Sequence, residues 1–447
     1  MNTLNISAKL ALLEGKAGSA QAELLASARR VIARLGKAGF AGCFVGGAVR
    51  DLMLGRTLKE VDIATDALPA DLKKLFKKTV LVGEAFGVVC VFDKGLQFEV
   101  ATFRQERSYT DGRHPDIIAP GTLEQDVARR DFTVNGLVLD PQSGDVLDYV
   151  GGLADLDQRL LRAIGAPAER VQEDYLRALR AARFAAVLDF QLDPATLTAV
   201  QDAAPGLRRI SRERVRMELE KMCVGGGLVR GLHLLDLCGL APYVFPLVDG
   251  IDGEGLAAAG RLIAGVSDSA DLPLLVAAVN LAVQPDLALK PVSHRRADSL
   301  LAGQARDLRM SSAQRKELQR LVALVAGLAN LKQRRLGERA ELYRQEQFPR
   351  ALHLVRTLLE EADRDGTFLD GMEDERNSLS PMRLDPPSLI TGQDIAAAGL
   401  SPGPRFKSLL REAAWLTTEG QLTTREEALA WLDLKTSGGE AGNFDPS

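Results

Sequence analysis

The sequence predicts an α+β fold, with a mixed sheet and helices in an N-terminal head and only helices after it. Up to about residue 150, short runs rich in β-branched and aromatic residues recur between Gly, Asp and Pro, as in "GCFVGG", "VDIAT" and "GVVCVFD". Apolar residues take helical spacing there at 21–38 and 69–78. Beyond residue 150 strand-like runs nearly vanish, and Leu, Ala and Arg recur at helical spacing as far as residue 435.

Composition narrows the class of protein. The chain has 447 residues, of which 46% are hydrophobic and 26% charged, as in ordinary globular proteins of roughly three domains. No apolar run reaches the ~18–20 residues of a membrane span, and the N-terminus has no signal-peptide pattern, so we expect a cytoplasmic protein without membrane contact. The first twenty residues predict an exposed amphipathic helix. Four scattered cysteines predict buried free thiols.

A short stretch from Val45 to Thr65, "VGGAVRDLMLGRTLKEVDIAT", combines two glycines, an arginine and two acids. Alternation along a strand would place Glu60 and Asp62 on one face. Two neighbouring carboxylates repel each other unless a cation lies between them, and hard oxygen ligands suit Mg²⁺. Two such ions can hold the attacking and leaving oxygens of a phosphoryl transfer. The alternative is an exposed strand end with Arg50 pairing Asp51.

A second polar pattern lies on the predicted helix "EDYLRALRAARFAAVL". Arginine and carboxylate side chains together can present donors and acceptors to a base edge. The alternative is a salt-bridged surface helix, with its alanines providing a surface for close packing. The polar residues recur every three positions: Asp174, Arg177, Arg180 and Arg183.

The motif at 46–65 resembles the signature of CCA-adding tRNA nucleotidyltransferases of the bacterial and eukaryotic branch and of bacterial poly(A) polymerases. Both belong to the DNA polymerase beta nucleotidyltransferase superfamily. The likeness runs from about residue 27 to 225 and returns near the C-terminus. It implies a polymerase-beta-type head followed by an all-helical neck, body and tail. It also implies that Gly47 and Arg50 hold the triphosphate and that Glu60 and Asp62 bind the catalytic Mg²⁺ ions, although the family usually has Asp at position 60.

The same resemblance implies roles for other residues. In "ARRDFTVNGLVLD", Arg130 and Asp131 would contact ribose and the nucleotide, the alternative being a helix-start ion pair. Asp174 and Arg177 would act as a protein template for the base, with Glu173 orienting Arg177. Arg180 and Arg183 would line the nucleotide site.

Three further segments also carry candidate functional residues. Glu99 could approach the metal pair as a third acid or lie at a solvated edge. The loop "DGRHPD", with Asp111, Arg113 and His114, corresponds to the segment that helps relatives switch from C to A addition. The segment Leu207–Met222 resembles the family's neck and could also contact tRNA phosphates.

The resemblance also suggests a division of the chain. It comprises an N-terminal extension (1–26), a nucleotidyltransferase head (27–150), a neck with the templating helix (151–224), a helical body (225–345), a tRNA-binding tail (346–435) and a disordered C-terminus (436–447).

The expected function is addition of C and A from CTP and ATP to the 3′ end of tRNA. An A-adding enzyme with a separate CC-adding partner, a poly(A) polymerase and an inactive RNA-binding protein remain alternatives. "GEAFGVVCV" at 83–91 lacks the Arg-rich stretch typical of the poly(A) polymerases. The sequence does not indicate an oligomeric state.

Overall fold

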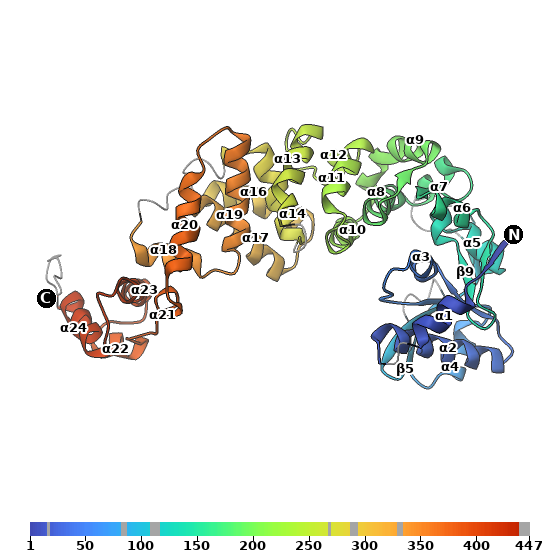
Figure 1. Cartoon of the computed structure of the whole chain (residues 1–447), viewed down its shortest axis with the longest axis horizontal. Coiled ribbons are helices and arrows are strands. Elements are labelled where there is room, and N and C mark those ends of the chain that lie inside the picture. The colour runs from blue at the N-terminus through green and yellow to red at the C-terminus, as the bar shows by residue number, and fades with distance from the viewer. Residues whose placement is uncertain are drawn as a thin grey trace. The chain divides into compact units, whose positions relative to one another are not determined.

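The computed structural model describes residues 1–15, 18–81, 87–107, 117–266, 270–286, 294–328 and 334–437. The chain divides into two compact units, residues 1–246 and 247–447. Figure 1 labels most of their helices and some of their strands. The finer domain boundaries expected from the sequence stay predictions. No helix among the described residues is long and apolar enough to cross a membrane.

The first unit is built on a mixed eight-stranded sheet. Its order is β1-β10-β9-β2-β3-β6-β5-β4, and only the β3–β6 pair is parallel among these neighbours. The strands are β1 (Asn2–Asn5), β2 (Gly42–Val45), β3 (Asp62–Thr65), β4 (Thr79–Leu81), β5 (Val88–Asp93), β6 (Leu96–Thr102), β9 (Val138–Asp140) and β10 (Asp145–Asp148). Two small sheets pair β7 (Arg104–Arg107) with β8 (Ile117–Pro120), and β11 (Leu160–Leu161) with β12 (Gln191–Leu192).

Helix α2 (Ala20–Lys37) packs against strands β2, β3, β5 and β6 of this sheet. The side chain of Ser19 accepts a hydrogen bond from the backbone N–H of Ala22 and so caps the helix. An apolar stripe at helical spacing, which includes Leu25, Val31 and Leu35, is buried under the sheet. The other helices of the head are α1 (Ser7–Glu14), α3 (Gly47–Met53), α4 (Pro69–Leu75), α5 (Leu123–Ala128) and the 3₁₀ turn η2 (Thr133–Asn135).

The rest of the first unit is helical. Helix α8 packs closely on α10 and α11, and five of its alanines are buried, as the sequence predicts. A Cβ atom at Gly227 would lie 2.7 Å from the backbone of Ala186, so glycine is needed where α11 meets α8. These helices are α6 (Gly152–Asp157), α7 (Pro167–Glu173), α8 (Leu176–Leu188), α9 (Pro194–Ala203), η3 (Ala204–Arg209), α10 (Arg212–Val224), α11 (Leu228–Leu237) and α12 (Ala241–Val244).

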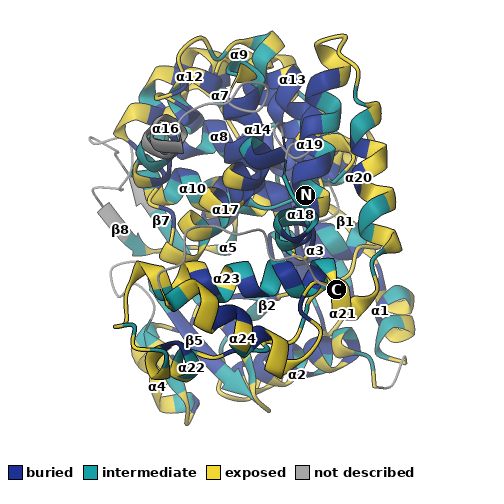
Figure 2. Ribbon diagram, turned by 90° about the vertical axis from the view of Figure 1, so that its left-hand side faces the viewer, coloured by how far each residue is buried: buried dark blue, intermediate teal, exposed yellow. Residues whose placement is uncertain are grey.

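The second unit is helical throughout its described residues. Helix α14 is buried along nearly its whole length, as its dark blue ribbon in Figure 2 shows. A separate apolar core around Trp431 and Ile395 joins the last three helices. The helices are α13 (Gly253–Ala264), α14 (Leu272–Val283), α16 (His294–Asp307), α17 (Ser312–Leu328), α18 (Leu336–Tyr343), α19 (Phe348–Glu361), α20 (Thr367–Ser378), α21 (Pro381–Leu384), α22 (Gly392–Ala397), α23 (Pro404–Glu419) and α24 (Arg425–Thr436).

The predicted fold class is confirmed, with one correction at the N-terminus. Where one amphipathic helix was expected, the chain forms strand β1 and then the short helix α1. Strand β1 pairs with β10 because Ile6 donates to the Gly144 carbonyl and the Asn5 amide donates to Ser143 and Asp145. All four cysteines are free and buried, as predicted.

Candidate active site

A polar cavity of about 710 Å³ lies within the first unit. Eight of its lining residues are Arg or Lys and five are Asp or Glu, so cations exceed anions, as a polyphosphate ligand requires. All ten site residues expected from the sequence line it: Gly47, Arg50, Glu60, Asp62, Arg130, Asp131, Asp174, Arg177, Arg180 and Arg183. The remaining lining residues are Gly46, Glu99, Arg129, Asn135, Leu176, Phe184, Arg214 and Lys221.

One end of the cavity is acidic. Strand β3 pairs with β6 in parallel, with Ile63 opposite Val100, so the preceding residues Asp62 and Glu99 come side by side. Glu60 lies just before β3 and not within it, which corrects the expected strand alternation, yet it lines the same cavity. Burial, followed by the negative charges of Glu60 and Glu99, raises the pKa of Asp62 to about 6.

These carboxylates fit a hard divalent cation by their chemistry. Three carboxylates from two chain segments face one cavity, and their mutual repulsion is the kind that a bound cation relieves. The described residues hold no preassembled cluster of three metal-ligating side chains.

The glycine turn leads directly into α3 beside the acids. Gly46 has φ +70°, a conformation that favours glycine, and a Cβ there would lie 3.0 Å from the Arg130 guanidinium. Arg50, one turn into α3, donates to Asp51 at 2.9 Å and to the Asn135 side-chain oxygen at 2.5 Å. The pairing with Asp51 that the alternative interpretation proposed is therefore present, but the arginine is buried, not exposed, and it lines the cavity.

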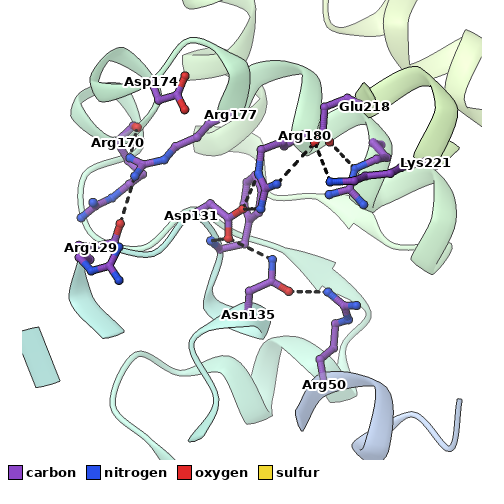
Figure 3. Close-up of polar contacts among 12 residues, drawn as sticks. Arg50, Arg129, Asp131, Asn135, Arg170, Asp174, Arg177, Arg180, Glu218 and Lys221 are labelled. Atoms are coloured by element: carbon purple, nitrogen blue, oxygen red, sulfur yellow. Dashed lines mark hydrogen bonds and ion pairs between the residues drawn. The ribbon is translucent and has the colours of Figure 1, made fainter. Parts of the chain in front are cut away.

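Asp131 lies at the centre of the hydrogen bonds drawn in Figure 3. It accepts hydrogen bonds from the Phe132 backbone at 2.8 Å, from Asn135 at 3.0 Å and from Arg180 at 2.9 and 2.5 Å. Burial alone would raise its pKa, but the charge of Arg180 and these hydrogen bonds hold the pKa of Asp131 well below its usual range. Asp131 is therefore an ionised group that fixes Arg180.

The neighbouring Arg130 reaches the cavity from the end of α5. It pairs with Asp126 at 3.0 Å, and among the described residues its Nε has no hydrogen-bond partner although it is buried. A guanidinium with one donor left over can still bind an oxygen of a ligand.

Asp174 is not on a helix, which corrects the continuous helix expected at 173–188. Helix α7 ends at Glu173, Asp174 has extended backbone angles (φ −147°, ψ 105°), and α8 begins at Leu176. Its carboxylate accepts hydrogen bonds from Arg214 of α10 at 2.6 and 3.3 Å and from the Leu176 backbone at 3.1 Å. Asp174 thus presents its carboxylate from the break between two helices.

Arg177 is held by neighbouring groups at the start of α8. It pairs with Glu173, as expected, and donates to the carbonyls of Arg170 at 2.7 Å and Arg129 at 3.1 Å. The Arg129 contact is visible in Figure 3. The side chain is thus tied to both α5 and α7, which limits its freedom at the cavity wall.

Glu218 of α10 neutralises the basic side of the cavity. Its buried carboxylate pairs with Arg183, with Arg180 at 3.6 Å and with Lys221 at 3.6 Å. Burial lowers the pKa of Arg183, although the charge of Glu218 opposes this. Glu218 lies on α10, in the neck segment whose charges suggested tRNA contacts. Some charged residues of this helix therefore contact residues of the cavity.

The sequence reasoning missed Asn135, Phe184, Arg214 and Lys221. Arg214 and Lys221 lie in a segment rich in charge, where spacing alone does not separate solvent-facing from cavity-facing residues. Asn135 has no distinctive local pattern, because its contact with Asp131 gains significance only from Arg50, which lies 85 residues away in the sequence. Asp111, Arg113 and His114 of the expected switching loop lie outside the described residues.

Comparison with known proteins identifies the class of protein first. Residues 43–162 match the Poly A polymerase head domain, and residues 189–251 match the family described as the probable RNA and SrmB- binding site of polymerase A. Together with the mixed sheet and the acid-and-arginine cavity, these matches define a nucleotidyltransferase.

Similar whole proteins identify the family. The CCA-adding enzyme of Levilactobacillus brevis is 34% identical over 406 residues, which cover 90% of this chain and 96% of that one. The chain therefore belongs to the CCA-adding enzyme family, and the resemblance noted in the sequence is confirmed. The match to the CCA-adding enzyme of Limosilactobacillus fermentum, at 45% identity, spans about half of each protein: 46% of this chain and 51% of that one.

Solved structures agree with this fold. The crystal structure of the Bacillus stearothermophilus CCA-adding enzyme in complex with CTP has a TM-score of 0.68 at 29% identity and covers 92% of this chain and 98% of its own. The Thermotoga maritima CCA-adding enzyme complexed with tRNA has a TM-score of 0.64 at 20% identity. The match covers 97% of this chain and 98% of that one. The latter likeness supports the fold alone.

Proposed function

We propose that this protein adds C, C and A to the 3′ end of tRNA from CTP and ATP, in the cytoplasm and without a nucleic-acid template. The observation that carries the proposal is a single cavity with an acidic end, a glycine–arginine turn and an Asp174/Arg177 pair. The relative that supports it over nearly the whole chain is itself a CCA-adding enzyme.

The acidic end supplies the chemistry of nucleotide transfer. Glu60 and Asp62 are the proposed ligands of Mg²⁺, with Glu99 as a third carboxylate at the same end. The bound ions would lower the pKa of the attacking hydroxyl and neutralise the departing pyrophosphate. Gly46 and Gly47 offer close backbone approach to the triphosphate, and Arg50 offers a charged donor fork to its oxygens.

The other end of the cavity selects the base. Asp174 presents acceptors and Arg177 presents donors, while Arg180 and Arg183 line the wall beside them. Cytosine and adenine both carry an amino donor beside a ring-nitrogen acceptor, whereas uracil and guanine carry the reverse pattern. One Asp/Arg pair can therefore accept both correct bases, and a wrong base leaves buried polar groups unpaired. Arg130 and Asp131 are the proposed ribose side of the site.

The test uses three tRNA transcripts, ending at the discriminator base, after the first C and after the second C. Each is incubated with Mg²⁺ and with CTP, ATP or both, and the products are resolved at single-nucleotide length. We expect two C additions and one A addition that then stops. Addition of A to the third transcript alone would identify an A-adding enzyme, and long A tails would identify a poly(A) polymerase.

Variants at the acidic end test the assignment of the ligands. Asp62→Ala should abolish transfer while tRNA still binds, because it removes a metal ligand and no tRNA contact. Glu60→Asp should retain activity, since a carboxylate remains, and Glu60→Ala should not. Activity of Glu60→Ala near that of the wild type would remove residue 60 from the metal site.

A further inference from the structure

Two arginines with separate proposed tasks are joined through one buried amide. Arg50 of α3 donates to the side-chain oxygen of Asn135 at 2.5 Å, and the amide nitrogen of Asn135 donates to Asp131 at 3.0 Å. Asp131 in turn holds Arg180 of α8 at 2.9 and 2.5 Å. Figure 3 shows this chain of contacts from Arg50 up to Arg180.

Asn135 is suited to this position because its amide accepts at one end and donates at the other. Arginine can only donate and an ionised aspartate can only accept, so the orientation of the amide is fixed by its two partners. The side chains are shielded from water: the exposed fraction is 7% for Arg50, 6% for Asn135 and 7% for Asp131. Losing either contact would therefore leave a buried polar group without a replacement partner.

The same two arginines also share an aromatic ring. The guanidinium carbons of Arg50 and Arg180 lie 5.2 and 5.1 Å from the ring centroid of Phe184, within the range of cation–π attraction. The ring is fixed by an edge-on contact with Phe132, at 5.8 Å between centroids. A polar route and an aromatic route thus connect α3 with α8.

We propose that Asn135 and Phe184 are positioning residues that couple recognition of the base to placement of the triphosphate. The inference rests on the proposed function, in which Arg50 holds the triphosphate and α8 carries the base-reading residues. A base that pairs correctly at the start of α8 keeps Arg180 in place, and Asp131 and Asn135 then keep Arg50 aligned. A wrong base shifts Arg180, and the triphosphate loses its alignment for transfer.

Coupling of this kind has a kinetic signature. Alignment of the triphosphate contributes to the rate of the bound complex, so the wild-type protein should discriminate against UTP in kcat as well as in KM. Without the connection, the base still affects binding, but it no longer controls the alignment. The ratio of kcat for CTP to kcat for UTP should then shrink.

The experiment measures single-nucleotide addition to a tRNA ending at its discriminator base, with CTP and UTP, for the wild type and for Asn135→Ala, Asn135→Asp and Phe184→Leu. We expect Asn135→Ala to lower kcat for CTP about tenfold and to change kcat for UTP much less. Asn135→Asp should narrow the kcat ratio too, since it places a carboxylate against Asp131. Phe184→Leu should also reduce the ratio of kcat for CTP to kcat for UTP, by a smaller factor.

Asn280→Ala is the matched control. Asn280 is also a buried asparagine with one amide hydrogen bond, to the Val276 carbonyl at 2.7 Å, but it belongs to α14 of the second unit. The Asn280→Ala variant should leave the ratio of kcat for CTP to kcat for UTP unchanged, even if its stability falls. Variants of Asn135 and Phe184 that lose rate equally with both nucleotides would overturn the proposal, and Phe184→Leu decides if the Asn135 variants do not fold. Failure of the wild type to add CTP would instead overturn the proposed function.

Discussion

Two aspartates in one cavity have opposite electrostatic surroundings. Asp131 is surrounded by donors, and Arg180 with its neighbours holds the pKa of that carboxyl well below its usual range. Asp62 is buried and lies near the acids Glu60 and Glu99. Burial and these two negative charges raise the pKa of Asp62 to about 6. Asp131 therefore has its partners already, whereas Asp62 would gain an opposite charge from the cation proposed above.

The raised pKa of Asp62 predicts a pH-dependent cost in stability. The usual pKa of the carboxyl is 3.8, so its ionisation does not reduce the free energy of unfolding below about pH 4. The reduction grows as pH rises from there through 6. In metal-free buffer, Asp62→Asn should exceed the wild type in free energy of unfolding by about 1 to 3 kcal/mol at pH 7.5, and by a smaller amount at pH 4.5. Urea unfolding with EDTA at both pH values measures the difference.

Added Mg²⁺ provides the control for this prediction. The ion should bind the folded wild type at pH 7.5 and reduce the advantage of Asp62→Asn, because ligands that bind only the folded state stabilise it. An advantage that is equal at both pH values, or that persists unchanged with Mg²⁺, would contradict the assignment of Asp62 as a charged ligand.

At the scale of elements, the break between α7 and α8 could not be predicted from local sequence. Most of the residues at 173–188 are the good helix formers Ala, Leu, Arg and Glu, and the segment has no Gly or Pro. Tertiary contacts override that preference. The ring of Tyr175 packs against Gly206, where a Cβ would lie 2.1 Å from it, and Asp174 pairs with Arg214. Both partners lie 30 to 40 residues further along the chain, so periodicity carries no information about them.

Arg214 holds Asp174 in this break, so substitution of Arg214 tests whether the position of Asp174 matters for base selection. Removing its guanidinium frees the Asp174 carboxylate, so Arg214→Ala should raise UTP incorporation relative to CTP, as Asp174→Ala and Arg177→Ala should. Arg216→Ala is the matched control, because Arg216 lies on the same helix but outside the cavity lining, and it pairs with its neighbour Glu220 at 2.9 Å. Misincorporation kinetics on tRNA should separate the two, and equal effects would exclude a specific role for Arg214.

The close contact between α8 and α11 predicts a second effect at this scale. Gly227→Ala would place a methyl group 2.7 Å from the backbone of Ala186, and backbone cannot move aside as a side chain does. We expect a loss of about 1 to 3 kcal/mol in unfolding free energy. Gly36→Ala on α2, where the nearest atom is 3.7 Å away, should be neutral or stabilising by up to about 1 kcal/mol. Chemical denaturation of both variants tests the contrast.

For the molecule as a whole, the sequence predicts a mixed-sheet head followed by helices, which is confirmed, and ten candidate residues that all line one cavity. Strand-like runs and helical spacing are local signals, and the Gly–Arg and Glu-x-Asp motifs are short, so both are readable from one segment. The connections between motifs are not. Asn135, Phe184 and Glu218 each make one contact with a residue 35 to 134 positions away, and their proposed roles depend on that contact. A single sequence does not record such partners.

The location of the whole cavity in one unit gives a prediction at this scale. Every lining residue lies between Gly46 and Lys221, and the first unit extends to residue 246. A fragment of residues 1–246 should therefore fold and bind CTP within about threefold of the full chain. Calorimetric titration measures this, and circular dichroism verifies folding. A folded fragment that fails to bind CTP would show that the second unit contributes to the site.

The first strand has a practical consequence for work with this protein. Strand β1 is four residues long, its side chains are exposed, and it covers the edge of β10 from the very start of the chain. Without it, the backbone donors and acceptors of β10 would be open to pairing with another molecule. An affinity tag is therefore better fused behind the C-terminus, since trimming or crowding Asn2–Asn5 would invite edge-to-edge association and loss of protein during purification.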